Sequence, residues 1–309
     1  MDKLESSHLI RVLSLESGLL PEQVANIVRT APFRYKSFKV KKRTGGLRQL
    51  AQPAKEVKWI QSRVVDFLRP LLPMHDAVNA YEVGSSIKKN AGIHASSRFL
   101  LKMDFSNFFP SILESDIVAH INCFAPSISE VDAFVITRSC MWANGRKFPL
   151  QLCIGAPSSP FLSNSVMYSF DDLISKKAAE RDITYTRYAD DLTFSSRREG
   201  ILADFQSMVE VVISEILYPR LKLNTAKTLH ASRAGRRVVT GIVITPEGEL
   251  SVGRDRKRLV RAMAHRDSMS QLDSDGVDKL EGLINFIDGI EPGFAQKARR
   301  WRNKKVAGA

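Results

Sequence analysis

The chain has 309 residues, of which 44% are hydrophobic, so it can bury a large core and form two or three subdomains. Its formal net charge of +13 indicates a polyanionic partner, either nucleic acid or an anionic membrane. No apolar run approaches the ~18 residues that span a bilayer, and the polar N-terminus does not resemble a signal peptide. We therefore expect a nucleic-acid partner, no membrane association and a cytoplasmic location. Three widely spaced cysteines and scattered histidines argue against a disulfide framework or a zinc site.

The first part of the sequence predicts short helices followed by a basic strand pair. Residues 1–31 have helical apolar spacing, with Pro21 at a favoured helix start. Residues 32–63 carry ten basic residues against one acid, Glu56, and glycines 45 and 46 mark a turn between two strands. A solvated hairpin packed on its aromatic side explains the interleaved aromatic residues but not the shortage of acids. We therefore expect a strand pair that binds phosphate.

The middle of the chain is predicted to alternate strands and helices. An apolar strand begins near Phe99 and ends near Asp104, and an aromatic turn follows it. The breaker cluster at residues 155–160 contains glycine and proline, which allow the backbone to come close to a ligand. Helices are expected from about Ser115 and over residues 129–144 and 161–179.

Residues 183–196 predict a β-hairpin with two adjacent carboxylates, Asp190 and Asp191, at its turn. Neighbouring side chains of a strand point to opposite faces, but a turn can bring adjacent carboxylates toward one point. Their mutual repulsion suggests a bound cation, and a hard divalent ion is the natural partner for oxygen ligands. A second acidic pair, Asp171 and Asp172, falls within an expected helix and is interpreted as a solvated helix face.

Asp104 is a third candidate carboxylate, because it closes an apolar strand. An acid in that position is unusual unless it is paired, exposed or metal-bound. Three carboxylates from two strand ends, Asp104, Asp190 and Asp191, are typical of a two-metal site for phosphoryl transfer. Such a site holds two Mg²⁺ ions about 3.5–4 Å apart, with Mn²⁺ as the alternative ion. One ion would activate the attacking hydroxyl and the other would bind the triphosphate.

The last part of the chain predicts a mixed region followed by a basic helix. The basic helix carries six basic residues against one acid, and Leu259 and Met263 are expected to share its apolar face. A surface helix docked by an apolar stripe and a helix that binds nucleic acid are compatible interpretations. The basic terminus at residues 299–305 is expected to fray. The expected elements are a helix over 203–217, strands over 236–244 and 249–252, and the basic helix over 254–266.

The order and spacing of these motifs resemble the reverse transcriptases over about residues 33–250. The stretch around Asp104, the loop at 155–160, the turn at 188–191 and the block at 223–228 follow one another as in that family. The resemblance implies an α+β right-hand polymerase with fingers, an α/β palm and a small helical thumb. It also implies template-directed DNA synthesis from dNTPs on RNA, with an RNA–DNA hybrid as the product.

The resemblance further assigns residues that bind the nucleotide. Arg48 matches the finger arginine that grips the incoming triphosphate. Phe109 matches the aromatic residue that excludes a ribose 2′-OH, and the alternative is that it belongs to the core. Many family members have Pro-Gln where this chain has Cys153 and Ile154, so we expect backbone contacts from that loop. The residues assigned to the nucleotide are Lys42, Arg48, Phe109, Gly155, Ala156 and Lys227.

Two further motifs resemble the retron subgroup, namely Asn90 with His94, and residues 239–241. Taken separately, His94 is better explained as a satisfied buried histidine, and residues 239–241 as a strand with a bulge, but together and in this order the two motifs favour the retron subgroup. The resemblance implies a structured non-coding RNA that serves as both template and primer, with priming from an internal 2′-OH. It also implies branched RNA-linked DNA (msDNA) and an accessory effector in phage defence. The residues expected to bind RNA or assist priming are Asn90, His94, Val239, Thr240, Gly241, Arg254, Arg258 and Arg261.

Two alternatives stay open at this point. One is a group II-like or other bacterial reverse transcriptase, and the other is a catalytically inactive RNA-binding scaffold, against which the three aspartates argue. The expected subdomains are an N-terminal helical extension with fingers over residues 1–99, a palm over 100–252 and a basic helical thumb over 253–309. A finger segment is expected within the palm at about residues 113–150.

Overall fold

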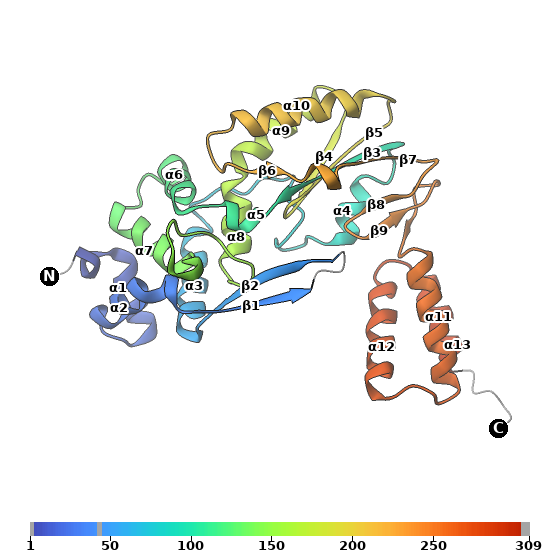
Figure 1. Cartoon of the computed structure of the whole chain (residues 1–309), viewed down its shortest axis with the longest axis horizontal. Helices are drawn as coiled ribbons and strands as arrows, with labels where there is room; N and C mark the ends of the chain where they lie inside the picture. Colours follow the sequence, from blue (N-terminus) through green and yellow to red (C-terminus); the bar gives the residue numbers. More distant parts are fainter. Residues whose placement is uncertain (1–2, 42–44, 304–309) are drawn as a thin grey trace.

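The computed structural model describes residues 3–41 and 45–303, and Figure 1 shows their arrangement. Short helices lie at the N-terminal end of the long axis, helices packed around an antiparallel sheet occupy the centre, and a bundle of three helices lies at the opposite end. The expected α+β class is confirmed by this content. Within the described part of the chain, no helix is both long enough and apolar enough to cross a membrane.

Two short helices, α1 (His8–Ser17) and α2 (Pro21–Thr30), confirm the helices expected over residues 1–31. The side chain of Ser7 caps α1 by accepting a hydrogen bond from the backbone N–H of Ile10. Proline begins α2, where its missing N–H has no intrahelical partner to lose. The described 3₁₀ segments are η1 (Lys3–Ser6), η2 (Ala31–Phe33), η3 (Asn144–Arg146) and η4 (Thr225–Lys227).

The basic strand pair predicted from the sequence is present as β1 (Tyr35–Lys41) and β2 (Leu47–Pro53). The two strands are antiparallel, with Tyr35 opposite Pro53 and Lys41 opposite Leu47. Most of their side chains are exposed, so the pair presents its basic residues to solvent. Figure 1 shows the hairpin running below the central sheet toward the side that carries the C-terminal bundle.

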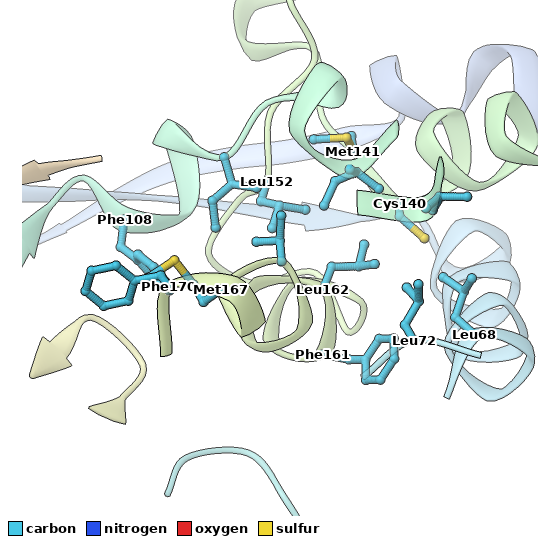
Figure 2. Packing of buried hydrophobic residues seen from close by; sticks show 14 of the residues in the cluster. Leu68, Leu72, Phe108, Cys140, Met141, Leu152, Phe161, Leu162, Met167 and Phe170 are labelled. Carbon is cyan, nitrogen blue, oxygen red and sulfur yellow. The ribbon is translucent and has the colours of Figure 1, made fainter. Parts of the chain in front are cut away.

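The largest hydrophobic core lies among the helices that surround the hairpin and the central sheet. Figure 2 shows Leu68 and Leu72 close to Phe161, and Phe108 close to Phe170. Fully burying one such side chain contributes about 1.5–3 kcal/mol. The helices of this region are α3 (Lys55–Leu68), α5 (Phe108–Ser111), α6 (Glu114–Phe124), α7 (Glu130–Cys140), α8 (Ser159–Val166) and α9 (Tyr168–Ala179).

Two of the helices in the structure differ in extent from the helices predicted from the sequence. The helix predicted over residues 129–144 ends at Cys140, because the backbone of Trp142 instead pairs with Gln151 through two hydrogen bonds of 2.8 and 3.0 Å. The helix predicted over 161–179 is two helices, α8 and α9, which meet at Met167. The helix expected from Ser115 is α6, which begins one residue earlier.

The central sheet has five antiparallel strands in the order β4-β5-β3-β6, with β7 also paired to β3. Strand β3 continues past Asp104 to Ser106, so the carboxylate lies within the strand rather than at its end. Figure 1 shows α9 and α10 (Ile201–Glu215) above this sheet. The strands are β3 (Phe99–Ser106), β4 (Thr184–Tyr188), β5 (Asp191–Ser196), β6 (Lys222–Leu223) and β7 (Leu229–Ser232).

A second, smaller hydrophobic core joins α4 (Ile87–Ile93) to a three-stranded sheet and the C-terminal helices. Val260 and Met263 of the basic helix are buried in it, whereas Leu259 is 44% exposed, so the expected apolar face was wrong for Leu259. The elements are β8 (Arg237–Val239), β9 (Ile242–Ile244), β10 (Leu250–Ser251), α11 (Arg254–Ser268), α12 (Ser274–Asp288) and α13 (Pro292–Asn303).

The expectation that the terminus frays from residue 299 was also wrong for its described part. Residues 299–303 belong to α13, and the Trp301 ring packs against the Phe294 ring with centroids 5.6 Å apart. The guanidinium of Arg261 lies 5.1 Å from the centroid of Trp301. The indole ring therefore ties the end of α13 to α11, because an arginine over an aromatic face is attracted to it.

The interpretation of Asp171 and Asp172 as a solvated face was wrong for Asp171. Its side chain is fully buried and forms an ion pair with Arg187, with 2.6 Å between Nη2 and Oδ2. The hydroxyl of Tyr185 also donates to Asp171, at 2.7 Å. Asp172 is the partly exposed neighbour and pairs with Lys176 on the outside of α9. Adjacent helical residues point about 100° apart, so one acid of the pair faces β4 and the other faces solvent.

Asp171→Asn is expected to lower the free energy of unfolding by about 3 kcal/mol or more, because it leaves the buried charge of Arg187 without a counter-charge. Asp172→Asn is the matched control and should change stability by less than about 1 kcal/mol, because its ion pair is partly exposed. Urea unfolding followed by circular dichroism measures both variants. Equal losses would show that Arg187 does not depend on the charge of Asp171.

Candidate active site

The hairpin turn between β4 and β5 brings the two adjacent carboxylates next to Asp104. Strands β3 and β5 pair so that Asp104 lies directly opposite Asp191. The backbone N–H of Phe105 donates to the carbonyl of Asp190, at 3.1 Å, which ties the turn to β3. Residues directly opposite each other in an antiparallel pair have Cα atoms about 4.5–5.5 Å apart. The three carboxylates that the sequence singled out therefore come together at one place.

The electrostatics of this place are dominated by burial and by repulsion among the carboxylates. Burial, with a contribution from the charge of Asp104, raises the pKa of Asp190. Burial also raises the pKa of Asp191 to about 6, and the charges of Asp190 and Asp104 act in the same direction, against Lys102. Neighbouring carboxylates are expected to raise each other's pKa, because each charge disfavours ionisation of the next.

Lys227 bonds directly to one of these carboxylates. Its Nζ donates to Oδ2 of Asp104 at 2.8 Å, and this hydrogen bond raises the pKa of Lys227. The sequence assigned Lys227 to the nucleotide, and the structure places it beside the first carboxylate. Among residues 3–41 and 45–303, no three His, Cys, Asp or Glu side chains are already grouped as a metal site.

The loop at residues 155–160 packs against strand β2, which carries the exposed Arg48. The backbone N–H of Ala51 donates to the carbonyl of Ile154 at 2.9 Å. Gly155 has φ +116, and a Cβ there would lie 2.9 Å from the carbonyl oxygen of Ala51, so any larger residue would clash. Ala156 is buried beside it. The loop therefore fixes β2 and its Arg48 relative to the central sheet, while Lys42 lies outside the described residues.

The two phenylalanines after β3 differ in exposure. Phe108 is buried and stacks on Phe105 with centroids 5.9 Å apart, so it belongs to the core. Phe109 is half-buried at the edge of the same core, with its centroid 5.4 Å from that of Phe108. Of the pair, Phe109 is therefore the one that can reach a ligand beside Asp104.

The motif of Asn90 and His94 is buried, so the expected direct contact of these side chains with RNA does not fit this structure. Both residues are 0% exposed. The imidazole of His94 bonds the hydroxyls of Ser195 at 2.7 Å and Thr186 at 2.8 Å, and burial lowers the pKa of His94 to about 3. A neutral histidine between β4 and β5 matches the alternative of a satisfied buried histidine.

Of the residues near the C-terminus that are expected to bind RNA, some are exposed and others are buried. Val239 is 0% exposed, which excludes its side chain from a direct contact in this conformation. Gly241 is exposed at the turn between β8 and β9, and the hydroxyl of Thr240 donates to the carbonyl of Ile87 in α4 at 3.2 Å. The remaining three, Arg254, Arg258 and Arg261, are exposed on α11.

Two residues at this site were not assigned a role from the sequence. Lys102 lies on β3, and its charge partly offsets the rise in the pKa of Asp191. Tyr81 lies in the segment before α4 with φ +65, and its side chain is 49% exposed. Neither has a sequence signal of its own, because a lysine in a strand and an isolated tyrosine in a loop are both common.

Comparisons with known proteins agree with this geometry. Residues 40–259 match the family of reverse transcriptases, described as RNA-dependent DNA polymerases. The chain is 37% identical over 268 residues to the retron Ec83 reverse transcriptase of Escherichia coli, covering 86% of each chain. It is 30% identical over 287 residues to the retron Ec86 reverse transcriptase of the same species, covering 90% of this chain and 83% of that one.

A solved structure shows the same fold at low identity. The structure of apo telomerase from Candida tropicalis matches with a TM-score of 0.52 and 13% identity, covering 91% of this chain. This chain spans 60% of the length of that telomerase chain. The likeness concerns the fold alone and supports the right-hand polymerase architecture expected from the sequence.

Asp191→Asn is expected to stabilise the protein at neutral pH in the presence of a chelator. A carboxyl whose pKa rises from 3.8 to about 6 on folding contributes stability below pH 3.8 that is lost as the pH rises through 6. The advantage of the variant should therefore be largest above about pH 6 and small below about pH 4. Denaturant unfolding at several pH values measures this difference. A variant that is less stable than the wild type at neutral pH would contradict the expectation.

Proposed function

Since the chain belongs to the retron reverse transcriptases, which are RNA-directed DNA polymerases, we propose that Asp104, Asp190 and Asp191 catalyse its nucleotidyl transfer. The observation that carries this proposal is the register of β3 and β5, which sets Asp104 opposite Asp191 next to a turn that holds Asp190. Three carboxylates from two strands would then act on one reacting phosphate.

The donor set of the site fits two Mg²⁺ ions, with Mn²⁺ as the alternative. Carboxylate oxygens are the ligands that these hard ions prefer. After the larger effect of burial, the neighbouring carboxylates add to the rise in the pKa of Asp190 and Asp191, and a divalent cation among them would relieve that repulsion. When bound, the ions would supply charge stabilisation for the attacking and leaving oxygens. One carboxylate oxygen of Asp104 accepts a hydrogen bond from Lys227. This ion pair would have to rearrange before both oxygens of Asp104 could bind a metal ion.

The residues around the carboxylates are proposed to hold the dNTP. Arg48 projects from β2, and its charge reaches Asp190, since it opposes the rise in the pKa of that residue. A guanidinium whose charge acts on Asp190 suits the triphosphate, which it can grip with two parallel hydrogen bonds. Phe109 would restrict the sugar. The remaining proposed contacts are Lys42, Gly155, Ala156 and Lys227.

The subdomain boundaries are proposed with one adjustment. We assign residues 1–99 to the N-terminal extension and fingers, 100–252 to the palm with a finger segment at about 113–150, and 253–309 to the thumb. The strands β8, β9 and β10 share their hydrophobic core with the thumb helices. Packing therefore favours treating residues 237–251 as the base of the thumb.

The substrate is proposed to be a structured non-coding RNA that serves as template and primer and is copied into RNA-linked msDNA from an internal 2′-OH. The retron relatives support this proposal, as does the exposed basic face of α11. Arg254, Arg258 and Arg261 would supply affinity for phosphate, while the shape of the thumb would select the RNA. A role in phage defence with an accessory effector is the corresponding biological proposal.

Asp190→Asn should reduce DNA synthesis on a primed RNA template by at least about a hundredfold, because it removes a carboxylate that would stabilise transition-state charge. Primer extension with Mg²⁺ measures the rate, and a filter-binding assay should show RNA binding nearly unchanged. Asp172→Asn is the matched control and should keep wild-type activity, since Asp172 lies on the outer face of α9. Near-wild-type synthesis by Asp190→Asn would remove the residue from the proposed site.

Nucleic acid that copurifies with the chain tests the RNA and priming proposals. The wild type, expressed with its neighbouring non-coding DNA, should yield DNA joined covalently to one structured RNA, whereas Asp190→Asn should yield the RNA alone. Sequencing identifies the RNA, and a debranching enzyme specific for 2′–5′ linkages should release the DNA. DNA with an unlinked 5′ end, or RNA of random sequence, would contradict the proposal.

A further inference from the structure

Tyr81 adopts a backbone conformation that suits glycine, although its side chain is large. Its φ is +65, in the left-handed region that residues with a side chain rarely adopt. Its ring belongs to none of the hydrophobic clusters formed by the described residues and is 49% exposed. Neither backbone geometry nor core packing therefore accounts for an aromatic residue at this position. Strained residues of this kind are concentrated at functional sites.

The segment that ends at Tyr81 is fixed to the catalytic hairpin by backbone hydrogen bonds. The N–H of Asn79 donates to the carbonyl of Arg187 at 2.8 Å, and the N–H of Arg187 donates to the carbonyl of Ala77 at 2.9 Å. Residues 78 and 187 form a parallel bridge. Tyr81 therefore follows, by two residues, a segment that is paired to the strand leading into the catalytic turn.

A single buried network sets the positions of Tyr81 and of the catalytic turn. The amide of Asn164 donates to the carbonyl of Ala80 at 2.9 Å, directly before Tyr81. The Nη1 group of Arg187 donates to the carbonyl of Ala189 at 3.2 Å, directly before the catalytic aspartates. The same Nη1 group donates to Oδ1 of Asn164, at 3.2 Å. The residue before Tyr81 and the residue before Asp190 are thus held by one network, which consists of the side chains of Asn164 and Arg187.

The charges that act on Tyr81 come from both β2 and the turn after β4. Burial raises the pKa of Tyr81, the charges of Asp190 and Tyr188 add to the rise, and Arg48 opposes it. The phenol therefore lies within range of both the finger arginine and a catalytic carboxylate. A dNTP that binds between Arg48 and Asp190 would therefore come within reach of this ring.

We propose that the ring of Tyr81 is a contact surface for the nascent base pair, the incoming dNTP together with its template base, and that this contact sets dNTP affinity. The proposal rests on the active site proposed above. Aromatic rings stack on nucleic-acid bases with little sequence preference, because every base has a π-face. Such a contact suits a polymerase, which must accept four different base pairs in turn.

Tyr81→Gly separates this role from a structural one. Glycine adopts a positive φ without strain, so the variant should be at least as stable as the wild type if only the backbone matters. The loss of the ring should raise KM for each dNTP by roughly tenfold or more in single-nucleotide incorporation on a primed RNA template. Tyr81→Phe keeps the ring and should stay within about twofold of the wild type. Tyr81→Asn, which also tolerates a left-handed backbone, serves as a second variant without the ring.

Val83→Ala is the matched control, since Val83 lies two residues further along the same loop and is fully exposed. It should leave KM unchanged. A wild-type KM in Tyr81→Gly or Tyr81→Asn would overturn the proposal, as would an equal rise of KM in Tyr81→Phe, which would assign the effect to the hydroxyl. Asp190→Asn run in parallel keeps the two proposals distinguishable, because synthesis by that variant would refute the metal-binding carboxylates and not the ring of Tyr81.

Discussion

The buried ion pair between Arg187 and Asp171 is the interaction on which the hairpin of β4 and β5 depends. Removing two charges from water is costly unless their hydrogen-bonding groups are satisfied. All three nitrogens of the Arg187 guanidinium have partners, since they donate to Asp171, to the side chain and carbonyl of Asn164, and to the carbonyl of Ala189. Asp171 also accepts from the hydroxyl of Tyr185. A network satisfied in this way favours one arrangement over its alternatives, because any rearrangement leaves a buried donor or acceptor unpaired.

That rigidity matters because the neighbouring turn, which holds Asp190, is electrostatically unfavourable. Three carboxylates meet where β3 and β5 pair, and burial together with mutual repulsion raises the pKa of Asp190 and Asp191. Ala189 adds strain with φ +56. The turn would relax if it were free, and its carbonyl bond to Arg187 opposes this. The hydrogen bonds and ion pair of Arg187 thus offset the backbone strain and charge repulsion of the turn. Strain that is compensated by the surrounding structure is frequent at active sites.

The sequence predicted the elements that local patterns determine. The hairpin at 183–196, the strand that carries Asp104 and the basic strand pair follow from residue alternation and turn residues, and the structure contains all three. The same local patterns could not show which side of α9 faces the sheet, so Asp171 and Asp172 were treated alike. They also could not show that His94 is enclosed by two hydroxyls. Burial of a polar residue depends on partners distant in sequence, and Ser195 is 101 residues from His94.

Helix α4 belongs to the smaller hydrophobic core and contacts both the three-stranded sheet and strand β4 of the central sheet. His94, which follows its last turn, bonds side chains of β4 and β5, while Ala91 packs in the core shared with the thumb helices. The hydroxyl of Thr240 holds the sheet at the base of the thumb to the start of α4. Buried Asn90, at the centre of this helix, has no hydrogen-bond partner for its side chain among the described residues. A displacement of β8 and β9 must either carry α4 with it or break one of these contacts. Because His94 is bonded to the strands on both sides of the turn that holds Asp190, the same helix joins the smaller core to that turn through hydrogen bonds.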